Sequence, residues 1–254
     1  YFDPHYPYRT NEPWFGRANR SPYRSFAELA HAETARVHRR LEQIPPDAPL
    51  PVEDLSRLSS LGTLAARHPF FLFRYLKSTV KAPDAPQARF LRAAYSSEVS
   101  RVDAALAGAL AELGVDDRTL VIITSDHGEE LFDHGDLGHR NADSLYQELI
   151  RVPLIVRLPG GRAAGTVIDA PVSTLDLMPT ILEVAGLPVP DGLAGRSLLP
   201  LVEGDEPAPR DLRAEVQTLT PPGREHTDRD QILALVRYPW KYIHDYRDDR
   251  GELY

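Results

Sequence analysis

The stretch TLVIITSDHGEELFDHGDLGHR, residues 119–140, decides the fold. Residues 120–123 form a short apolar, β-branched run with no period-2 alternation, which is typical of a parallel strand buried on both faces. The run then breaks into the polar sequence Ser125, Asp126, His127 and Gly128. In open α/β sheets, ligands bind just past the carboxyl ends of the strands. The sequence therefore predicts an α/β domain with a ligand site directly after this strand.

Asp126 and His127 offer a carboxylate oxygen and an imidazole nitrogen, which together can bind one metal ion. The alternative interpretation is a turn, because Asp and Gly are common in turns. On these residues alone the two interpretations balance. The additional histidines downstream, His134 and His139, favour the metal site. Gly128 leaves room for a ligand or another backbone to approach closely.

Composition limits the possible functions. The 254 residues are enough for a large core in one domain, or in one domain with a small appendage. The chain has 29 Lys and Arg against 37 Asp and Glu, a net charge of −8, which argues against nucleic acid as a partner. An acidic protein can still bind an anionic ester where a metal and local donors reverse the field. No apolar run approaches the roughly 18 residues of a membrane span, and without cysteine no disulfide framework exists.

Hydrophobic periodicity predicts two long helices, over residues 25–43 and 87–113. Ser25 and Glu28 have the spacing of a capping box at the start of the first helix, and Gly114 suits the end of the second. Strands are expected at 152–156 and 167–172, and a short helix at 143–150. Ser173 and Asp176 suit the start of a further helix, which explains this Asp without a metal. Short β-type runs follow at 212–219, 231–238 and 240–246.

Several motifs resemble the sulfatase branch of the alkaline-phosphatase-like superfamily. They are TSDHGE, the following HG and GH pairs, SLYQELIRVPLIVRLPG and VSTLDLMPTILEVAGLP, in the expected order over roughly residues 95–200. Residues 1–8, YFDPHYPY, are similar to an earlier stretch of that family. The resemblance implies an α/β sandwich with a mostly parallel central sheet flanked by helices. It places a partial catalytic domain at 1–203, with a helical insertion at about 25–86, and an incomplete antiparallel C-terminal subdomain at 204–254.

The same resemblance implies the site residues. Asp126 and His127 would be the metal ligands, with Ca²⁺ expected first and Mn²⁺, Zn²⁺ or Mg²⁺ as alternatives. His5 and His139 would be catalytic, since the matching residues contact the anionic group of the substrate. His134 would lie near the rim of the site. For His5 the alternative is a loop histidine packed on Tyr6 and Tyr8.

The family also needs a nucleophile, a formylglycine made from Cys or Ser in sulfatases, or Thr or Ser in phosphoryl-transferring relatives. In the family, the nucleophile begins the motif Cys or Ser, any residue, Pro, any residue, Arg. Residues 21–24, SPYR, are similar to this motif but out of register, because Arg20 stands two residues before Pro22, at the nucleophile position. Residues 220–224 fit the pattern but follow the metal motif instead of preceding it. We therefore expect the nucleophile upstream. Tyr1 is not an initiator Met, and the final GELY lies in mid-domain in the family, so we expect a fragment of a longer protein.

Three hypotheses follow for the function. The first is a metal-dependent sulfatase acting on a small-molecule or carbohydrate sulfate ester. The second is a phosphate or phosphonate ester hydrolase, or a phosphoethanolamine-type transferase, of the same superfamily. The third is a catalytically silent protein that binds anions or carbohydrates. By resemblance, a periplasmic, secreted or outward-facing membrane-anchored location is compatible with all three, and the sequence indicates no oligomeric state.

Overall fold

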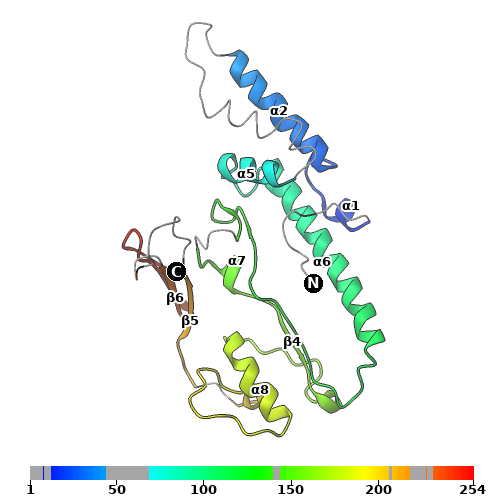
Figure 1. Cartoon of the computed structure of the whole chain (residues 1–254), viewed down its shortest axis with the longest axis vertical. Coiled ribbons are helices and arrows are strands. Elements are labelled where there is room, and N and C mark those ends of the chain that lie inside the picture. Colours follow the sequence, from blue (N-terminus) through cyan, green and yellow to red (C-terminus); the bar gives the residue numbers. More distant parts are fainter. Residues whose placement is uncertain are drawn as a thin grey trace. The chain divides into compact units, whose positions relative to one another are not determined.

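A computed structural model of the chain describes residues 8, 13–43, 69–139, 144–205, 208–217, 227 and 231–254. The chain forms two compact units (Figure 1). The first comprises residues 1–114 and 129–138, and the second comprises residues 115–128 and 139–254. No helix in the described ranges has the length and apolar character that crossing a membrane requires. The predicted division at residue 203 and the predicted insertion at 25–86 stay predictions.

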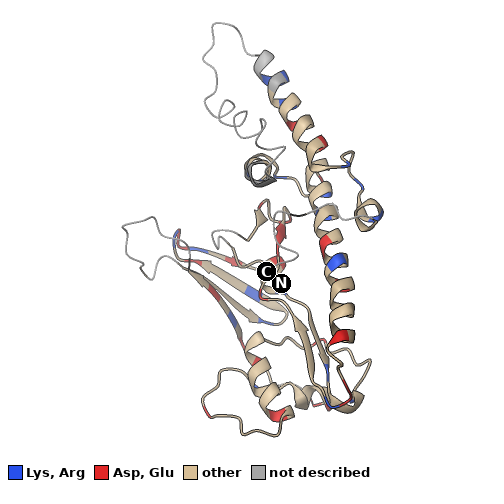
Figure 2. Cartoon of the chain, turned by 45° about the vertical axis from the view of Figure 1, so that its right-hand side comes forward, with Lys and Arg blue, Asp and Glu red and all other residues tan. Residues whose placement is uncertain are grey.

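The first unit is mainly helical. Its helices are α1 (Trp14–Ala18), α2 (Phe26–Glu42), α5 (Pro69–Thr79) and α6 (Pro86–Glu112). The predicted cap of α2 is confirmed, because the Ser25 hydroxyl accepts the Glu28 N–H at 3.2 Å. The predicted helix over 87–113 is also confirmed as α6, which ends just before Gly114 in a left-handed conformation. Charged residues of both signs are distributed along α6 (Figure 2).

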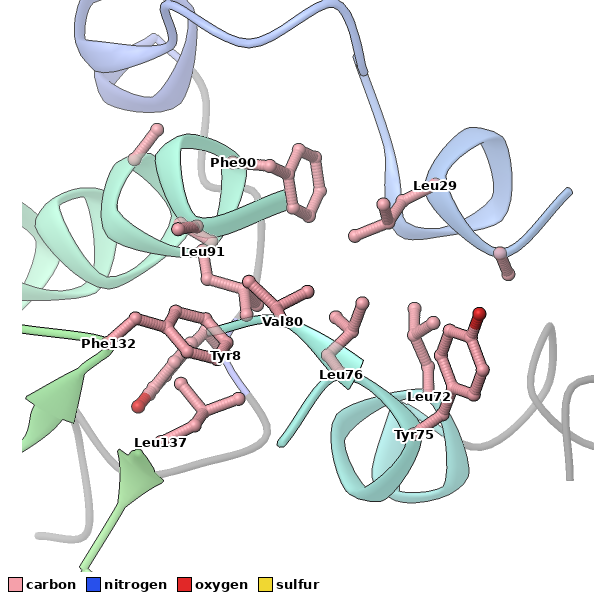
Figure 3. Packing of buried hydrophobic residues seen from close by; sticks show 14 of the residues in the cluster. Tyr8, Leu29, Leu72, Tyr75, Leu76, Val80, Phe90, Leu91, Phe132 and Leu137 are labelled. Atoms are coloured by element: carbon pink, nitrogen blue, oxygen red, sulfur yellow. The ribbon is translucent and has the colours of Figure 1, made fainter. Parts of the chain in front are cut away.

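A hydrophobic cluster joins α2, α5 and α6 (Figure 3). Leu29, Leu76 and Phe90 are each completely buried, one from each helix. The same helices share a buried polar network around Glu33, whose carboxylate accepts hydrogen bonds from Gln87 at 2.6 Å and Tyr75 at 3.2 Å. Burying a carboxylate is costly unless such donors satisfy it, so the network constrains how the three helices pack.

The hairpin of β2 (Glu130–Leu131) and β3 (Leu137–Gly138) completes this unit. Its turn is held by cations from the helices: Lys77 pairs with Asp136 at 3.0 Å and Arg92 with Asp133 at 2.9 Å. Glu129 and Glu130 could cap the amides of a following turn or face solvent by their sequence alone, and the structure excludes the second alternative because both are buried. The hairpin, which the sequence analysis did not anticipate, carries them inward.

In the second unit, β1 (Val121–Thr124) pairs with β4 (Leu154–Arg157), with Ile122 opposite Val156. The pairing is antiparallel, so the predicted mostly parallel central sheet is not confirmed by the described residues. The predicted burial on both faces is not observed either, because Val121, Ile122 and Ile123 are half-buried and Thr124 is exposed. An apolar run carries no information on strand direction. The helix predicted at 143–150 is present but shorter, as α7 (Gln147–Ile150). The strand predicted at 167–172 is not formed, because these residues are irregular.

The start of the helix pair η2 (Thr174–Asp176) and α8 (Leu177–Val184) matches the sequence prediction. Ser173 and Asp176 form a complete capping box. The Asp176 carboxylate, fully buried, also accepts the Arg196 N–H at 2.9 Å and both Nη groups of Arg210, one of them at 2.8 Å. Asp176 therefore connects three segments that are distant in the sequence.

The unit ends in a four-stranded antiparallel sheet in the order β5–β6–β7–β8. Its strands are β5 (Leu212–Gln217), β6 (Gln231–Arg237), β7 (Trp240–Asp245) and β8 (Arg250–Leu253). The first three confirm the predicted β-type runs. One face packs on residues 145–150 and contains Lys241 and Ile243, whereas Trp240 and Tyr242 are exposed on the other.

Lys241 is expected to make stability depend on pH in the alkaline range. Burial lowers the pKa of its ammonium to about 8, with the Glu148 carboxylate opposing that change. The unfolded chain keeps the proton up to the ordinary lysine pKa, so between the two values it binds more protons than the folded chain. The free energy of unfolding should therefore rise with pH over that interval, by about 3 kcal/mol in total.

Urea titrations of wild type and Lys241→Met from pH 7 to 10 measure this contribution as a difference, which removes the effects of other titrating groups. The wild type should gain stability relative to the variant as pH rises. Parallel curves for the two proteins would show that the ammonium is not disfavoured by burial.

Candidate functional site

The site begins where β1 ends. Directly after Thr124, the Ser125 hydroxyl donates to the His127 carbonyl at 2.7 Å and lies 3.3 Å from the Asp126 Oδ1 atom. The same Oδ1 atom accepts the His127 backbone N–H at 2.9 Å. These local hydrogen bonds fold residues 125–127 into a tight turn. The backbone bends at Asp126, in keeping with the turn interpretation. The metal site stays a prediction.

The orientation of the His127 ring is set by the backbone. Its Nδ1 atom lies 2.8 Å from the Gly128 carbonyl oxygen, so Nδ1 carries the proton and donates it. The Nε2 atom faces the carboxylate and lies 3.7 Å from Oδ2 of Asp126. Metal bonds to these atom types measure about 2.0–2.6 Å, so one cation can contact both atoms. The donor set therefore fits a divalent metal.

Both side chains are accessible and one is clearly ionised. The side chains of Asp126 and His127 are 85% and 43% exposed. Partial burial would raise the pKa of Asp126, but the His127 N–H and the His127 ring outweigh it and hold the pKa below its ordinary value. An ionised carboxylate is the state in which Asp126 binds a cation.

His139 lies beside His127 although eleven residues separate them. The two ring centroids are 4.2 Å apart, with 42° between the ring planes. The structure therefore brings together Asp126, His127 and His139, as the sequence placed them. His5 and Arg140 lie outside the described residues, and His134 belongs to the other compact unit, where it is exposed.

Gly128 fixes the turn against α7. Its N–H donates to the Leu149 carbonyl at 2.8 Å, and a Cβ atom at this position would lie 1.9 Å from the Glu148 carbonyl oxygen. The prediction that another backbone approaches Gly128 is confirmed. The sequence analysis missed the supporting partners, Ser125 and the α7 backbone. Ser125 directly beside Asp126 was the available signal, since Ser commonly bonds its own neighbouring backbone.

The side chains around Asp126 and His127 can be compared with the ligand sets that metal ions need. Within the described ranges, no group of three or more His, Cys, Asp or Glu side chains surrounds a common point. A hard cation such as Ca²⁺ takes six to eight oxygen ligands. Asp126 and His127 alone would not complete the coordination of such an ion.

Two family models match this chain. The model described as Sulfatase matches residues 54–187, and the model described as N-sulphoglucosamine sulphohydrolase, C-terminal, matches residues 135–254. Both matches include His139, and the first also includes Asp126 and His127.

Among curated proteins, the chain is similar to the multifunctional alkaline phosphatase superfamily protein PehA of Trinickia caryophylli. The identity is 35% over 189 residues, which are 67% of this chain and 34% of PehA. It is also similar to arylsulfatase K of Bos taurus, with 33% identity over 151 residues, 58% of this chain and 27% of that protein. The chain thus spans about a third or less of the length of these relatives.

The chain is also similar to solved structures. The phosphonate monoester hydrolase SpPMH from Silicibacter pomeroyi matches with a TM-score of 0.58 and 28% identity, over 84% of this chain and 44% of that one. The structure of BT4656 in complex with its substrate, D-glucosamine-2-N,6-O-disulfate, matches with a TM-score of 0.54 and 27% identity, over 89% of this chain and 44% of that one.

Proposed function

Since this chain belongs to the sulfatase family, we propose that it forms the part of a metal-dependent sulfate ester hydrolase that holds the metal and one substrate-binding histidine. The observation that carries the proposal is the placement of Asp126 and His127 at the end of β1 with the His139 ring 4.2 Å from that of His127. The similarity to arylsulfatase K and to the disulfate-bound BT4656 supports sulfate esters, including those of carbohydrates, as the substrate class.

In this proposal, Oδ2 of Asp126 and Nε2 of His127 hold the metal, with Ca²⁺ expected first and Mn²⁺, Zn²⁺ or Mg²⁺ as alternatives. The bound ion would act as a Lewis acid for an anionic ester. His139 lies beside these ligands and would donate a hydrogen bond to a non-bridging oxygen of the ester, where charge develops. His5 would make a second such contact. The nucleophile, a formylglycine made from Cys or Ser, is proposed to lie outside residues 1–254.

The second candidate is hydrolysis of phosphate or phosphonate monoesters. The similarity to SpPMH favours it, and an imidazole ligand suits Mn²⁺ or Zn²⁺ as well as Ca²⁺. Sulfate and phosphonate monoesters are both tetrahedral anions, so the described donors fit either group. The nature of the nucleophile would distinguish them.

Metal removal is expected to abolish activity. The test uses the full-length protein with 4-nitrophenyl sulfate and with a phenylphosphonate monoester, before and after treatment with EDTA. The proposal expects faster hydrolysis of the sulfate, loss of activity with EDTA, and recovery with added Ca²⁺. Faster hydrolysis of the phosphonate would favour the second candidate. Activity that persists without metal would exclude the assigned role of Asp126 and His127, and binding of either ester without hydrolysis would indicate a silent binding protein.

A further inference from the structure

The metal-site turn rests on α7 through direct backbone contact. Gly128 donates its N–H to Leu149, and its missing Cβ leaves the space that the Glu148 carbonyl occupies. The Gly128 carbonyl in turn accepts the Nδ1 proton of His127. The orientation of the His127 ring is therefore fixed through Gly128 to the backbone of residues 148 and 149.

Residues 144–150 are themselves held by the C-terminal sheet. Leu145 is buried in a cluster with Ile232 and Ala234 of β6 and Ile243 of β7. Tyr146 and Ile150 pack against this cluster. The Tyr146 hydroxyl donates to the Glu252 carboxylate of β8 at 3.0 Å. These contacts attach the short helix to one face of the sheet.

Lys241 is the charged member of this attachment. It lies on β7 among apolar side chains and is only 5% exposed. Its ammonium donates to the Leu145 carbonyl oxygen, and the Glu148 carboxylate is close enough to interact with its charge. An ammonium in such a place is costly to bury, and an apolar side chain would pack there without that cost. Its hydrogen bond holds the backbone at Leu145, three residues before Glu148, whose carbonyl Gly128 contacts.

We infer that Lys241, in the C-terminal sheet, is a positioning residue for the metal site, acting through Leu145, α7 and Gly128 on the ring of His127. The inference rests on the proposed function, in which His127 binds the metal. Residues that orient a metal-binding histidine typically change metal affinity by 10- to 100-fold when they are replaced. Here a series of contacts connects Lys241 in the C-terminal sheet to His127.

The test is Lys241→Met in the full-length protein, which removes the donor and keeps a long apolar side chain. Binding of Ca²⁺ and of Mn²⁺, measured by calorimetry on folded protein, is expected to weaken about 10- to 100-fold. The kcat for 4-nitrophenyl sulfate at saturating metal should also fall. The melting temperature of the metal-free protein should change by no more than about 5 °C, because removing a buried ammonium offsets the lost hydrogen bond.

The matched control is Arg213→Met, which removes a cation from the exposed face of β5, where Arg213 pairs with Glu215 at 2.7 Å. It should leave metal affinity and kcat unchanged. A second readout is the ¹⁵N spectrum of the His127 ring, in which the Nδ1-protonated tautomer should dominate in wild type and lose its dominance in Lys241→Met. This signature would not change if Lys241 only supported the sheet.

A double-mutant cycle with Gly128→Ala, measured on the folded variants, tests whether the two residues act through the same support. Because both substitutions disturb the same support, their effects on metal affinity should be clearly less than additive. Unchanged metal affinity and tautomer in folded Lys241→Met, or full additivity in the cycle, would overturn the inference. If His127→Ala itself kept full metal affinity, the proposed function would fail instead, so the two failures are distinguishable.

Discussion

Replacing His127 with Ala is expected to abolish ester hydrolysis by the full-length protein, lowering kcat/KM by roughly 10³-fold or more, the upper range for loss of one electrostatic group in an active site. Its Nε2 atom lies 3.7 Å from Oδ2 of Asp126, so the substitution removes half of the described ligand pair. Asp126→Ala should have the same effect. Steady-state kinetics and metal content by mass spectrometry measure the two consequences together.

His139→Ala provides the contrast that tests the separate roles. Because His139 is assigned to the ester oxygens, its loss should lower kcat strongly while the metal stays bound. The control is His31→Ala, an exposed histidine on α2, which should behave as wild type. Full activity in His127→Ala or Asp126→Ala would count decisively against the metal assignment, and loss of metal from His139→Ala would make His139 a ligand.

The largest effect on stability is expected for Asp176→Ala, with a decrease of about 3–5 kcal/mol in the free energy of unfolding at pH 7. This is the usual result when one member of a buried ion pair is removed. The variant would leave the guanidinium of Arg210, largely buried, without its carboxylate. It would also remove the acceptor for the N–H groups of Ser173 and Arg196. Urea unfolding monitored by circular dichroism gives the difference.

The same carboxylate predicts part of the acid sensitivity. Burial would raise the pKa of Asp176, but Arg210 and the backbone donors outweigh burial and lower it. A carboxyl with a depressed folded-state pKa stabilises the fold above its unfolded value, near pH 4, and this contribution is lost as pH falls through the folded value. Wild type should therefore lose more stability than Asp176→Ala on acidification below pH 4.

Asp211→Ala is the matched control, because Asp211 also forms a two-point pair, with Arg237 at 2.5 and 2.7 Å, at the protein surface. Solvent screens such pairs, so little stability should be lost. If Asp176→Ala is no more damaging than Asp211→Ala, then Asp176 is not the structural centre of this region.

The sequence predicted those parts of the structure that depend on neighbouring residues. The cap formed by Ser173 and Asp176 is a local pattern, and the structure confirms it. The helix over 87–113 is also confirmed, but its apolar stripe is buried only in the first half of α6, since Val99 and Leu113 are exposed. Asp126 and His127 are neighbours in the sequence, so their proximity needed no prediction of the fold. Gly128 has no side chain, which allowed the close approach of another backbone to be predicted. His139, which the family resemblance assigned to the same site, lies with its ring 4.2 Å from that of His127, and its catalytic role stays a prediction.

The parts that failed depend on distant partners. The run 120–123 shows that a strand is apolar on both faces but not which way its neighbour runs, and β4 proved antiparallel. For Glu129 and Glu130 the sequence leaves open a turn cap or a solvated position, and the hairpin buries them. Arg210 pairs with Asp176 across 34 residues, and no spacing rule links them. Lys241 reads as a strand residue, and only its contact with Leu145 connects it to the site.

The division of the chain into two compact units gives each unit its own fluorescent reporter. The sequence contains two tryptophans: Trp14 lies in α1 of the helical unit, and Trp240 lies on β7 with 60% of its surface exposed. Trp14→Phe leaves emission that reports only on the C-terminal sheet, and Trp240→Phe leaves emission that reports only on the helices. Intrinsic fluorescence of these two variants therefore shows in denaturant whether the units unfold as one cooperative transition or in sequence.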